Sequence, residues 1–403
     1  MPRAAPRGRL LKIRSKKREK AEREHGAQLR ITYIKNRGES MSVKIIHAAD
    51  FHLDSPFDAL PAEKAELRRA EQRELIRKIV SAANDEGADL ILLSGDLFDS
   101  DVSYHETGET LREAFADTEA RVFIAPGNHD YFCLKSPYSY VKFPENVHIF
   151  KSPAISCVDI PELNCRVWGA GFCSPLCEPM LTGFSCPTGS MTDIMVMHGE
   201  LGGGTYNRIS AQEIADSGLD YLALGHVHSF SGIMTVGETS YAYPGCPEGR
   251  GFDETGAKGI IAGSVGKGVR ELRFVPLGGR EYGVLNVDMT GSGSVYDALD
   301  GALPENAGRD IYRVNFTGEC GERVDIAAVR EAFGNRFFHA VFADKTVRPG
   351  DIWQGAGENS LRGVFLRRMK RAFDEASDSD KGQLEAAVRY ALAAIDRREG
   401  WRP

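Results

Sequence analysis

Seven side chains able to bind a metal ion stand just after, or at the ends of, short apolar runs that are typical of buried β-strands. They are Asp50, His52, Asp96, Asn128, His198, His226 and His228. One divalent cation uses about four to six such groups, so seven of them favour two ions. Two ions about 3.5–4 Å apart can share a bridging carboxylate and hold a hydroxide for in-line attack on phosphorus. We expect Asp96 to be that bridge.

The types of these ligands narrow the choice of metal. Imidazole, carboxylate and amide groups together suit Mn²⁺, which we expect, with Fe²⁺ and Zn²⁺ as alternatives. The eight cysteines include no C-x-x-C pair, and we interpret them as reduced cytosolic thiols. Cys173, Cys177 and Cys186 fall close together, but their spacing matches no common zinc pattern, which argues against a zinc site there.

The elements around the first three motifs alternate between strand and helix. Apolar periodicity predicts strands over 43–49, 89–93 and 121–125, joined by helices over 62–86 and 107–117. This order favours right-handed crossovers and a largely parallel sheet. Ligands of such sheets gather beyond the carboxyl ends of the strands, which is where the first three motifs fall.

After residue 145 the predicted strands come closer together, which indicates a second sheet packed against the first, with helices outside. We expect a helix over 210–217 and strands over 147–150, 165–168, 192–197, 219–224, 231–236, 240–243, 258–264 and 269–276. The stretch 170–191 is rich in Gly, Pro, Ser and Cys, and it predicts a long loop of the kind that is often functional.

The chain beyond residue 276 predicts a small separate α/β domain and two terminal helices. Its strands are expected over 282–287, 310–316 and 336–343, and its helices over 293–302, 323–332, 358–375 and 381–398. We therefore predict four regions, namely a basic extension over 1–40, a catalytic domain over 41–276, a second domain over 277–345 and a helical segment over 346–403.

Charge is distributed unevenly along the chain. Residues 1–40 carry about nine more positive than negative charges, so we expect a disordered extension, with a nucleic-acid-binding arm as the alternative. Met41 stands just before the first strand and looks like a natural start. Since the whole chain has a net charge of −7, the rest is near −16, which does not favour a broad nucleic-acid surface. A nucleic-acid groove would therefore be a local basic patch or come from a partner.

Hydropathy places the protein among cytoplasmic chains. The sequence has no apolar run near the roughly 20 residues that a membrane span needs. The N-terminal stretch also lacks the apolar segment of a secretory signal. We therefore predict a cytoplasmic protein without a membrane partner.

The motifs resemble a known family when they are taken in order. They are Asp50-x-His52, Gly95-Asp96, Gly127-Asn128-His129-Asp130, His198 and Gly225-His226-x-His228. Together they are similar to those of the calcineurin-like metallophosphoesterases over about residues 43–275. The resemblance implies a four-layer αββα sandwich, with the domain after 277 as a cap over the active site.

A finer resemblance is to the SbcD-type DNA-repair exonucleases, and within them to the YhaO-like branch. It rests on the segments His52–Phe57, Gly95–Asp99, Tyr221–His228, Tyr243–Gly245, Gly249–Glu254 and Glu358–Phe365. Some relatives have a histidine where this chain has Asp99, so a catalytic role does not transfer to that position. The resemblance implies cleavage of DNA phosphodiester bonds by a metal-bridging hydroxide.

The same resemblance implies roles for the site residues. One metal ion would be held by Asp50, His52, Asp96 and His228, and the other by Asp96, Asn128, His198 and His226. His129 would stabilise developing charge or protonate the leaving oxygen, which suits an imidazole near neutral pH, with Asp130 orienting it. The implied partners are DNA, a coiled-coil ATPase of the SbcC/YhaN type docked on the terminal helices, and a second copy of the chain.

Two other function classes are alternatives to the nuclease. A phosphatase or phosphodiesterase acting on a small molecule or phosphoprotein can use the same two-metal centre. The extra domain after residue 277 argues against the minimal single-domain phosphatases. A binding scaffold without activity is the third class, and the complete ligand set argues against it. Four further residues follow ligand motifs, namely Tyr206, Arg208, Tyr243 and Arg250. Contact with phosphate or a base and a structural role are equal alternatives for them.

Overall fold

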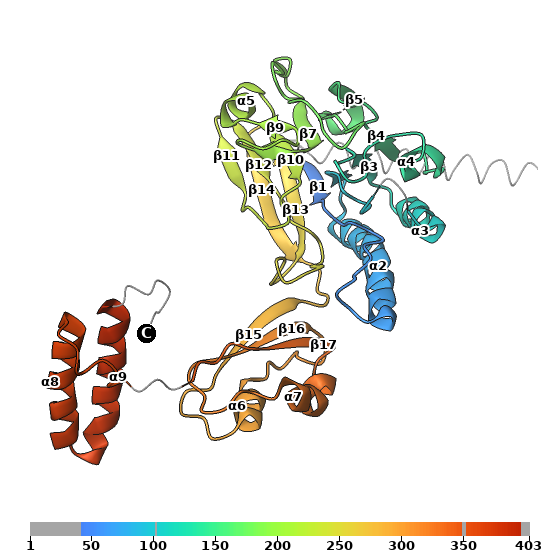
Figure 1. Cartoon of the computed structure of the whole chain (residues 1–403). Coiled ribbons are helices and arrows are strands. Elements are labelled where there is room, and N and C mark those ends of the chain that lie inside the picture. Colours follow the sequence, from blue (N-terminus) through green and yellow to red (C-terminus); the bar gives the residue numbers. More distant parts are fainter. Residues whose placement is uncertain (1–41, 101–102, 349–351, 396–403) are drawn as a thin grey trace, which may run out of the picture. The chain divides into compact units, whose positions relative to one another are not determined.

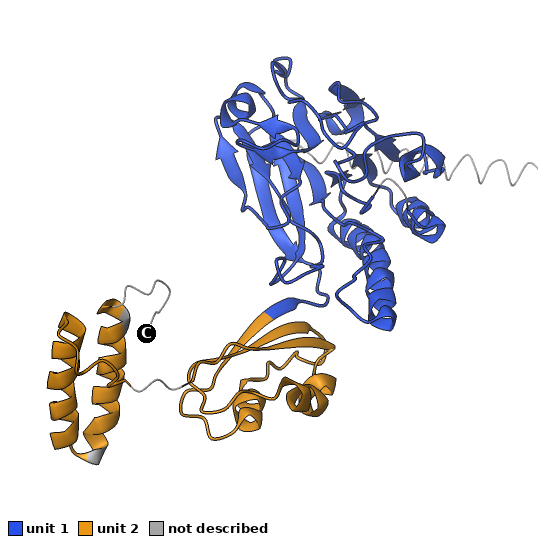
Figure 2. Ribbon diagram, in the orientation of Figure 1, with its two compact units in different colours: residues 1–283 blue, residues 284–403 orange. Residues whose placement is uncertain are grey.

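The computed structural model describes residues 42–100, 103–348 and 352–395 (Figure 1). The basic extension predicted over 1–40 lies outside these residues. The chain divides into two compact units, residues 1–283 and residues 284–403 (Figure 2). The strand Tyr282–Asp288 straddles this division, whereas the predicted domain boundary was at residue 277.

The first sheet of the first unit has the strand order β14-β13-β1-β2-β3-β4. Its strands are β1 (Val43–Ala48), β2 (Leu90–Leu93), β3 (Arg121–Ile124), β4 (Val147–Ile149), β13 (Gly259–Gly266) and β14 (Val269–Pro276). The pairs β1–β2, β2–β3 and β3–β4 are parallel, and β13 pairs antiparallel with β1. The predicted parallel core is therefore confirmed, and an antiparallel hairpin extends it.

The second sheet has the order β11-β12-β10-β7-β6-β5. Its strands are β5 (Ser156–Ile160), β6 (Cys165–Gly169), β7 (Thr192–His198), β10 (Tyr221–Gly225), β11 (Met234–Val236) and β12 (Thr239–Ala242). The sequence did not predict β5, because this edge strand is mostly exposed and lacks a regular apolar alternation. The short strands β8 (Glu200–Leu201) and β9 (Arg208–Ile209) form a separate pair.

The two sheets pack face to face and carry helices on their outer faces. A buried cluster between them includes Ile45 of β1 and Val196 of β7. The outer face of the first sheet packs against the helices α2 (Ala62–Glu86) and α3 (His105–Ala116), and the outer face of the second packs against α5 (Ala211–Asp216). Because β2 is buried on both faces, its sequence Leu90–Leu93 is continuously apolar. The four-layer αββα sandwich is confirmed.

Local sequence signals set the helix bounds. The helices and 3₁₀ turns of the first unit are α2 (Ala62–Glu86), α3 (His105–Ala116), α4 (Pro137–Tyr140), η1 (Pro161–Leu163) and α5 (Ala211–Asp216). Gly87 ends α2 in a left-handed conformation, directly after the predicted end of this helix at residue 86, and its N–H donates to the backbone oxygens of Ala83 and Asn84. Ser210 and Glu213 form a reciprocal capping box at the start of α5.

The second unit contains a three-stranded sheet with the order β15-β16-β17. Its elements are β15 (Tyr282–Asp288), α6 (Val295–Ala302), β16 (Ile311–Thr317), α7 (Ile326–Phe333), η2 (Gly334–Arg336) and β17 (His339–Asp344). Two further helices follow, α8 (Leu361–Glu375) and α9 (Asp378–Ile395), and they share a small apolar cluster. No helix among the described residues is both long and apolar enough to span a membrane.

Candidate metal centre

The metal-binding motifs begin with an unusual backbone at the ends of β1 and β2. Asp50, His52 and Asp96 have φ angles of 56°, 47° and 50°, a left-handed conformation that costs energy for residues other than glycine. The two segments also pair through their backbones, since Asp50 N–H donates to Gly95 O at 3.0 Å and His52 N–H to Asp96 O at 2.9 Å. The parallel pairing of β1 with β2 thus continues into the site.

Two glycines let the remaining motifs approach closely. A Cβ atom at Gly127 would lie 2.2 Å from Asp96 Oδ1, and one at Gly225 would lie 1.9 Å from Ser94 O. Both distances are shorter than any real contact, so these positions need glycine. The close approach of the Gly127 turn allows His129 N–H to donate to Asp96 Oδ1 at 3.0 Å.

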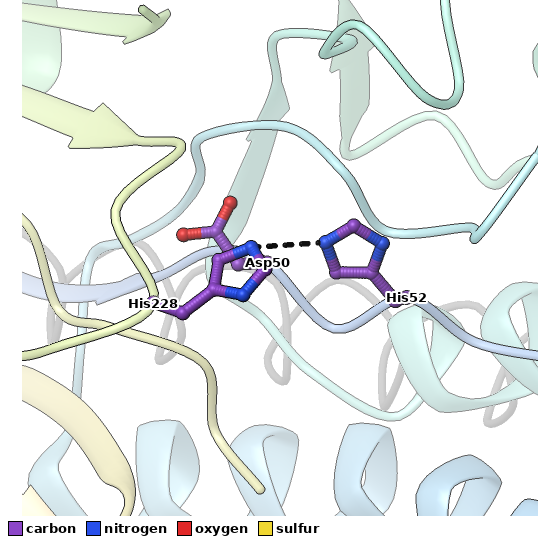
Figure 3. A group of neighbouring side chains, drawn as sticks. All are labelled: Asp50, His52 and His228. Carbon is purple, nitrogen blue, oxygen red and sulfur yellow. Dashed lines mark hydrogen bonds between the residues drawn. The ribbon is translucent and has the colours of Figure 1, made fainter. Parts of the chain in front are cut away.

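Two groups made only of predicted ligands converge at this edge of the sheets. The potential ligand atoms of Asp50, His52 and His228 lie within 4.8 Å of one another, as do those of Asp50, Asp96 and His198. A third group that meets the same criterion contains Asp99 and His129 beside His52. Figure 3 shows the first group, in which the His52 and His228 rings face each other with Nε2 atoms 3.2 Å apart. Asp96 Oδ2 lies 3.7 Å from His52 Nε2 and 3.4 Å from His198 Nε2. Asp96 therefore reaches both groups, as a bridging ligand must.

The last two predicted ligands adjoin the second group. Asn128 Oδ1 lies 3.0 Å from His198 Nε2, and the ring centroids of His226 and His198 are 5.3 Å apart. The structure thus brings all seven predicted side chains together. Their division between two metal ions stays a prediction.

Hydrogen bonds behind three of the rings decide which nitrogen carries the proton. His198 Nδ1 lies 2.9 Å from Ser94 O, His52 Nδ1 lies 3.0 Å from Asp99 Oδ1, and His228 Nδ1 lies 2.6 Å from Glu254 Oε1. Because carbonyl and carboxylate oxygens only accept, each Nδ1 carries the proton and each Nε2 keeps its lone pair. The three Nε2 lone pairs lie beside the neighbouring carboxylates. Together these groups fit the binding of divalent cations.

Burial shapes the electrostatics of the same groups. Burial lowers the pKa of His52 and of His226 to about 4, so both imidazoles are neutral at pH 7. Burial and the negative charge of Asp96 raise the pKa of Asp50 well above its usual range. Burial opposes the charge of Asp96 as well, but His198 and the other nearby histidines lower its pKa below the usual value. Buried carboxylates beside neutral imidazoles are a setting in which bound cations offset the desolvation of negative charge.

His129 lies at the exposed rim of the site. Its Nδ1 lies 3.2 Å from the backbone oxygen of Asp99, and its ring centroid lies 4.8 Å from that of His52. The carbonyl oxygen accepts from Nδ1, which leaves Nε2 for exchange of a proton with a bound molecule. This placement is compatible with the predicted general acid.

Asp130 has a different role from the predicted one of orienting His129. Its carboxylate is fully buried, and it accepts from the N–H groups of Asp96, Leu97, Phe98 and Gly127 at 3.2, 2.8, 3.3 and 2.7 Å. The Tyr138 hydroxyl also donates to it. His129 is not among its partners in the described part of the chain. Asp130 therefore joins two ligand-bearing loops, which the neighbouring sequence position could not reveal.

Several functional contacts were missing from the sequence prediction. Glu254 was not predicted, although its carboxylate contacts His228. Arg250 was weighed as a phosphate or base contact, but its guanidinium contacts Asp99 and Glu254 at 3.2 and 2.8 Å. Glu200 Oε2 lies 3.9 Å from His226 Nε2 and was also not predicted. Arg250 and Glu254 lie in the segment Gly249–Glu254 that carries the resemblance, and Glu200 follows His198 by two positions, but neither signal assigned these contacts.

Other sequence interpretations can be compared with the structure. Tyr243 has a structural contact, because its hydroxyl donates to Gly199 O at 2.9 Å. The Tyr206 ring lies 5.3 Å from that of His226. Among the described residues, the clusters that could hold a metal ion contain no cysteine.

Comparisons with known proteins agree with this geometry. Residues 43–230 match the family model for calcineurin-like phosphoesterases. The chain is 30% identical over 249 residues to the uncharacterized metallophosphoesterase YhaO of Bacillus subtilis (strain 168). That match covers 57% of this chain and 59% of the relative, so the chain spans well under two thirds of YhaO.

Two solved structures are more distant. The protein TT1561 of Thermus thermophilus is 14% identical, with a TM-score of 0.36, and the likeness covers 59% of this chain and 100% of that protein. A dimetal phosphatase from Danio rerio is 11% identical, with a TM-score of 0.37, over 60% of this chain and 100% of that protein. Neither likeness is close enough to add to the assignment. The matched segment, residues 43–230, contains all of the assembled aspartate and histidine side chains, so this part of the chain is similar to the calcineurin-like phosphoesterases.

Proposed function

We propose that this chain is a two-metal phosphodiesterase that cleaves DNA. The observation that carries the proposal is the position of Asp96, whose Oδ2 lies within 3.7 Å of His52 Nε2 and 3.4 Å of His198 Nε2. One carboxylate between two imidazole groups is the arrangement that a pair of metal ions shares. The match to calcineurin-like phosphoesterases supports hydrolysis of phosphoester bonds, and both this reaction and the DNA substrate are part of our proposal.

The residues present would hold the ions in two sets. Asp50, His52 and His228 would hold one, and Asn128, His198 and His226 the other, with Asp96 between them. Bound divalent cations supply Lewis-acid stabilisation of charge on phosphoryl oxygens and lower the pKa of a water molecule. We expect Mn²⁺, with Fe²⁺ and Zn²⁺ as alternatives, because the set mixes imidazole with carboxylate and amide oxygens.

The protein's own contribution to the reaction centres on His129. Its exposed position at the rim and its Nδ1 contact with Asp99 O leave Nε2 facing away from that carbonyl. In our proposal Nε2 passes a proton to the leaving oxygen of the diester. A positioned general acid of this kind contributes about 10²–10⁴-fold to a rate.

Two features support DNA over a small substrate. The motifs resemble those of the SbcD-type exonucleases, and the chain continues with a second compact unit beyond the phosphoesterase match. A second α/β unit with terminal helices is more than a minimal phosphatase needs. YhaO is described only as an uncharacterized metallophosphoesterase, so it says nothing about the substrate.

The test compares three substrates in the presence of Mn²⁺. We would measure hydrolysis of linear DNA, of bis(p-nitrophenyl) phosphate and of p-nitrophenyl phosphate by the wild type, by His129→Ala and by His105→Ala. His105 is an exposed histidine of α3 and serves as the matched control. We expect DNA and the diester to be cleaved, with a loss of about 10²–10⁴-fold in His129→Ala only. Cleavage of the monoester alone would overturn the proposal in favour of a phosphatase.

We also propose a coiled-coil ATPase of the SbcC/YhaN type and a second copy of the chain as partners. The helix α8 offers apolar side chains to such an ATPase, since Leu361 and Val364 are 77% and 46% exposed. Coexpression with a coiled-coil ATPase of this type should give a complex that Leu361→Glu with Val364→Glu weakens about tenfold or more. Sedimentation of the chain alone would test the dimer.

A further inference from the structure

Two carboxylates stand behind the two facing histidines of the first ligand group. Asp99 Oδ1 accepts from His52 Nδ1 at 3.0 Å, and Glu254 Oε1 accepts from His228 Nδ1 at 2.6 Å. The two acids come from separate loops, one after β2 and one before β13. Each fixes the tautomer of its histidine and the direction of its ring.

One guanidinium joins these two carboxylates. Arg250 Nη1 donates to Asp99 Oδ1 at 3.2 Å, and Nη2 donates to Glu254 Oε1 at 2.8 Å. The Arg250 backbone N–H also donates to Glu254 Oε2 at 2.7 Å. The Nε2 atoms of His52 and His228 are 3.2 Å apart. Together these contacts form a closed ring of five residues, namely His52, Asp99, Arg250, Glu254 and His228.

The proton positions in this ring have one competing arrangement. Arg250 Nη2 lies 3.2 Å from His228 Nδ1, which would require Nδ1 to accept. The contact from Nδ1 to the Glu254 carboxylate is shorter, at 2.6 Å. Both oxygens of Glu254 also accept from Arg250, Oε1 from Nη2 at 2.8 Å and Oε2 from the backbone N–H at 2.7 Å. The ionised carboxylate can only accept, so the proton lies on Nδ1 and the Nε2 lone pair faces His52.

The burial of this ring of residues explains why a cation is needed between its two carboxylates. The side chains of His52, Glu254 and Arg250 are 1%, 6% and 19% exposed. In such a setting the Glu254 carboxylate would be strongly desolvated without a counter-ion, whereas the Asp99 side chain is 29% exposed. Arginine suits the position because its planar fork can hold two oxygens at once, which a lysine ammonium on a flexible stem does less well.

We infer that Arg250 is a positioning residue for one of the two metal ions, acting by holding Asp99 and Glu254 against His52 and His228. The inference rests on the metal centre of the proposed function, and it goes beyond that proposal by assigning a role to three residues outside the predicted ligand set. It also explains why an aspartate suits position 99, because a carboxylate there accepts from both His52 and Arg250.

The test is a calorimetric titration of the metal-free full chain with Mn²⁺. We would compare the wild type with Arg250→Met, Arg250→Lys, Glu254→Gln and Arg112→Met. Arg112 is a partly exposed arginine of α3 that pairs with Glu109 at 2.8 Å, and it serves as the matched control. We expect Arg250→Met to weaken one of two Mn²⁺ sites by about 10–100-fold while the other changes little.

The conservative variants separate positioning from general damage. Glu254→Gln keeps an oxygen that can accept from His228 but loses its charge, so we expect a loss of about tenfold at the same site. We expect Arg250→Lys to recover only part of the affinity. High Mn²⁺ should restore kcat in Arg250→Met, whereas it should not restore kcat in His129→Ala.

Several outcomes would overturn the inference. Two intact Mn²⁺ sites in Arg250→Met, equal weakening of both sites, or no Mn²⁺ binding by the wild type would each do so. Two Mn²⁺ sites in a wild type that cleaves no phosphoester would instead contradict the proposed function. In that case the metal affinities of the variants would still decide the role of Arg250.

Discussion

Replacing Asp130 by asparagine should destabilise the first unit, although the two side chains have nearly the same shape. The carboxylate accepts four backbone N–H groups, two at each oxygen. Oδ1 accepts from Asp96 and Gly127, and Oδ2 accepts from Leu97 and Phe98. In asparagine one of these oxygens becomes an NH₂ group, which cannot accept.

The magnitude follows from the number of donors left without a partner. Whichever way the amide turns, two backbone N–H groups lose their acceptor in a fully buried setting. Each such group costs about 1–3 kcal/mol. The Tyr138 hydroxyl can rotate to accept from the new NH₂ group, so it adds little. We therefore expect a loss of about 3 kcal/mol in the free energy of unfolding.

The assay is urea unfolding of the metal-free protein followed by tryptophan fluorescence. The chain has three tryptophans, Trp168, Trp353 and Trp401. Trp168 lies on β6 of the first unit, so a Trp353→Phe, Trp401→Phe background makes the signal specific for that unit. Asp159→Asn on the exposed strand β5 is the control, and it should leave the midpoint nearly unchanged.

The reasoning makes a second demand on the same variant. Because Asp130 holds the loops that carry Asp96 and Asn128, Asp130→Asn should also weaken Mn²⁺ binding. A loss below about 1 kcal/mol, with Mn²⁺ affinity equal to that of the wild type, would refute the role of this carboxylate. Tyr138→Phe removes one hydrogen bond and should cost about 1 kcal/mol in the same assay.

Three further predictions concern the first unit. Arg68→Met should cost about 3–5 kcal/mol in urea unfolding, because the buried guanidinium pairs with Glu248 at 2.8 Å and its loss leaves that carboxylate buried and unpaired; a change under about 1 kcal/mol would contradict this. Burial lowers the pKa of His52 and His226 from 6.5 to about 4. As the pH falls, the unfolded chain therefore binds protons at these histidines at a higher pH than the folded chain does. Stability of the metal-free protein should therefore fall between pH 6.5 and 4, and the contribution of these two histidines should level off beyond these values; a flat profile over this range in unfolding titrations would refute the prediction. Gly127→Ala should reduce Mn²⁺ affinity at least tenfold in calorimetry, since its Cβ would lie 2.2 Å from Asp96 Oδ1; unchanged affinity would show that the turn can move.

The sequence was sufficient to predict the sandwich and the group of side chains at its edge. Strands β1, β2 and β3 are buried on both faces, so their apolar runs are visible without a structure. A polar residue directly after such a run must lie at the carboxyl edge of the sheet. For this reason Asp50, Asp96 and Asn128 could be placed together from local pattern alone.

The supporting residues could not be predicted in the same way. Asp99 and Arg250 are separated by 151 positions, and His228 and Glu254 by 26. Neither pair has a fixed spacing that a periodic element would impose, because each lies on irregular loops. The pairing depends on how the loops after β2 and before β13 pack against each other.

Asp130 illustrates the same division within a single motif. Its neighbour His129 made an orienting role plausible from sequence, but the side chains of adjacent residues point in different directions. The sequence by itself determined which strands end in metal-binding groups, since strand burial is written in local apolar runs. Only the tertiary structure decided which carboxylates bind the ligands' second nitrogens and which bind backbone N–H groups, because those contacts join loops that are distant along the chain.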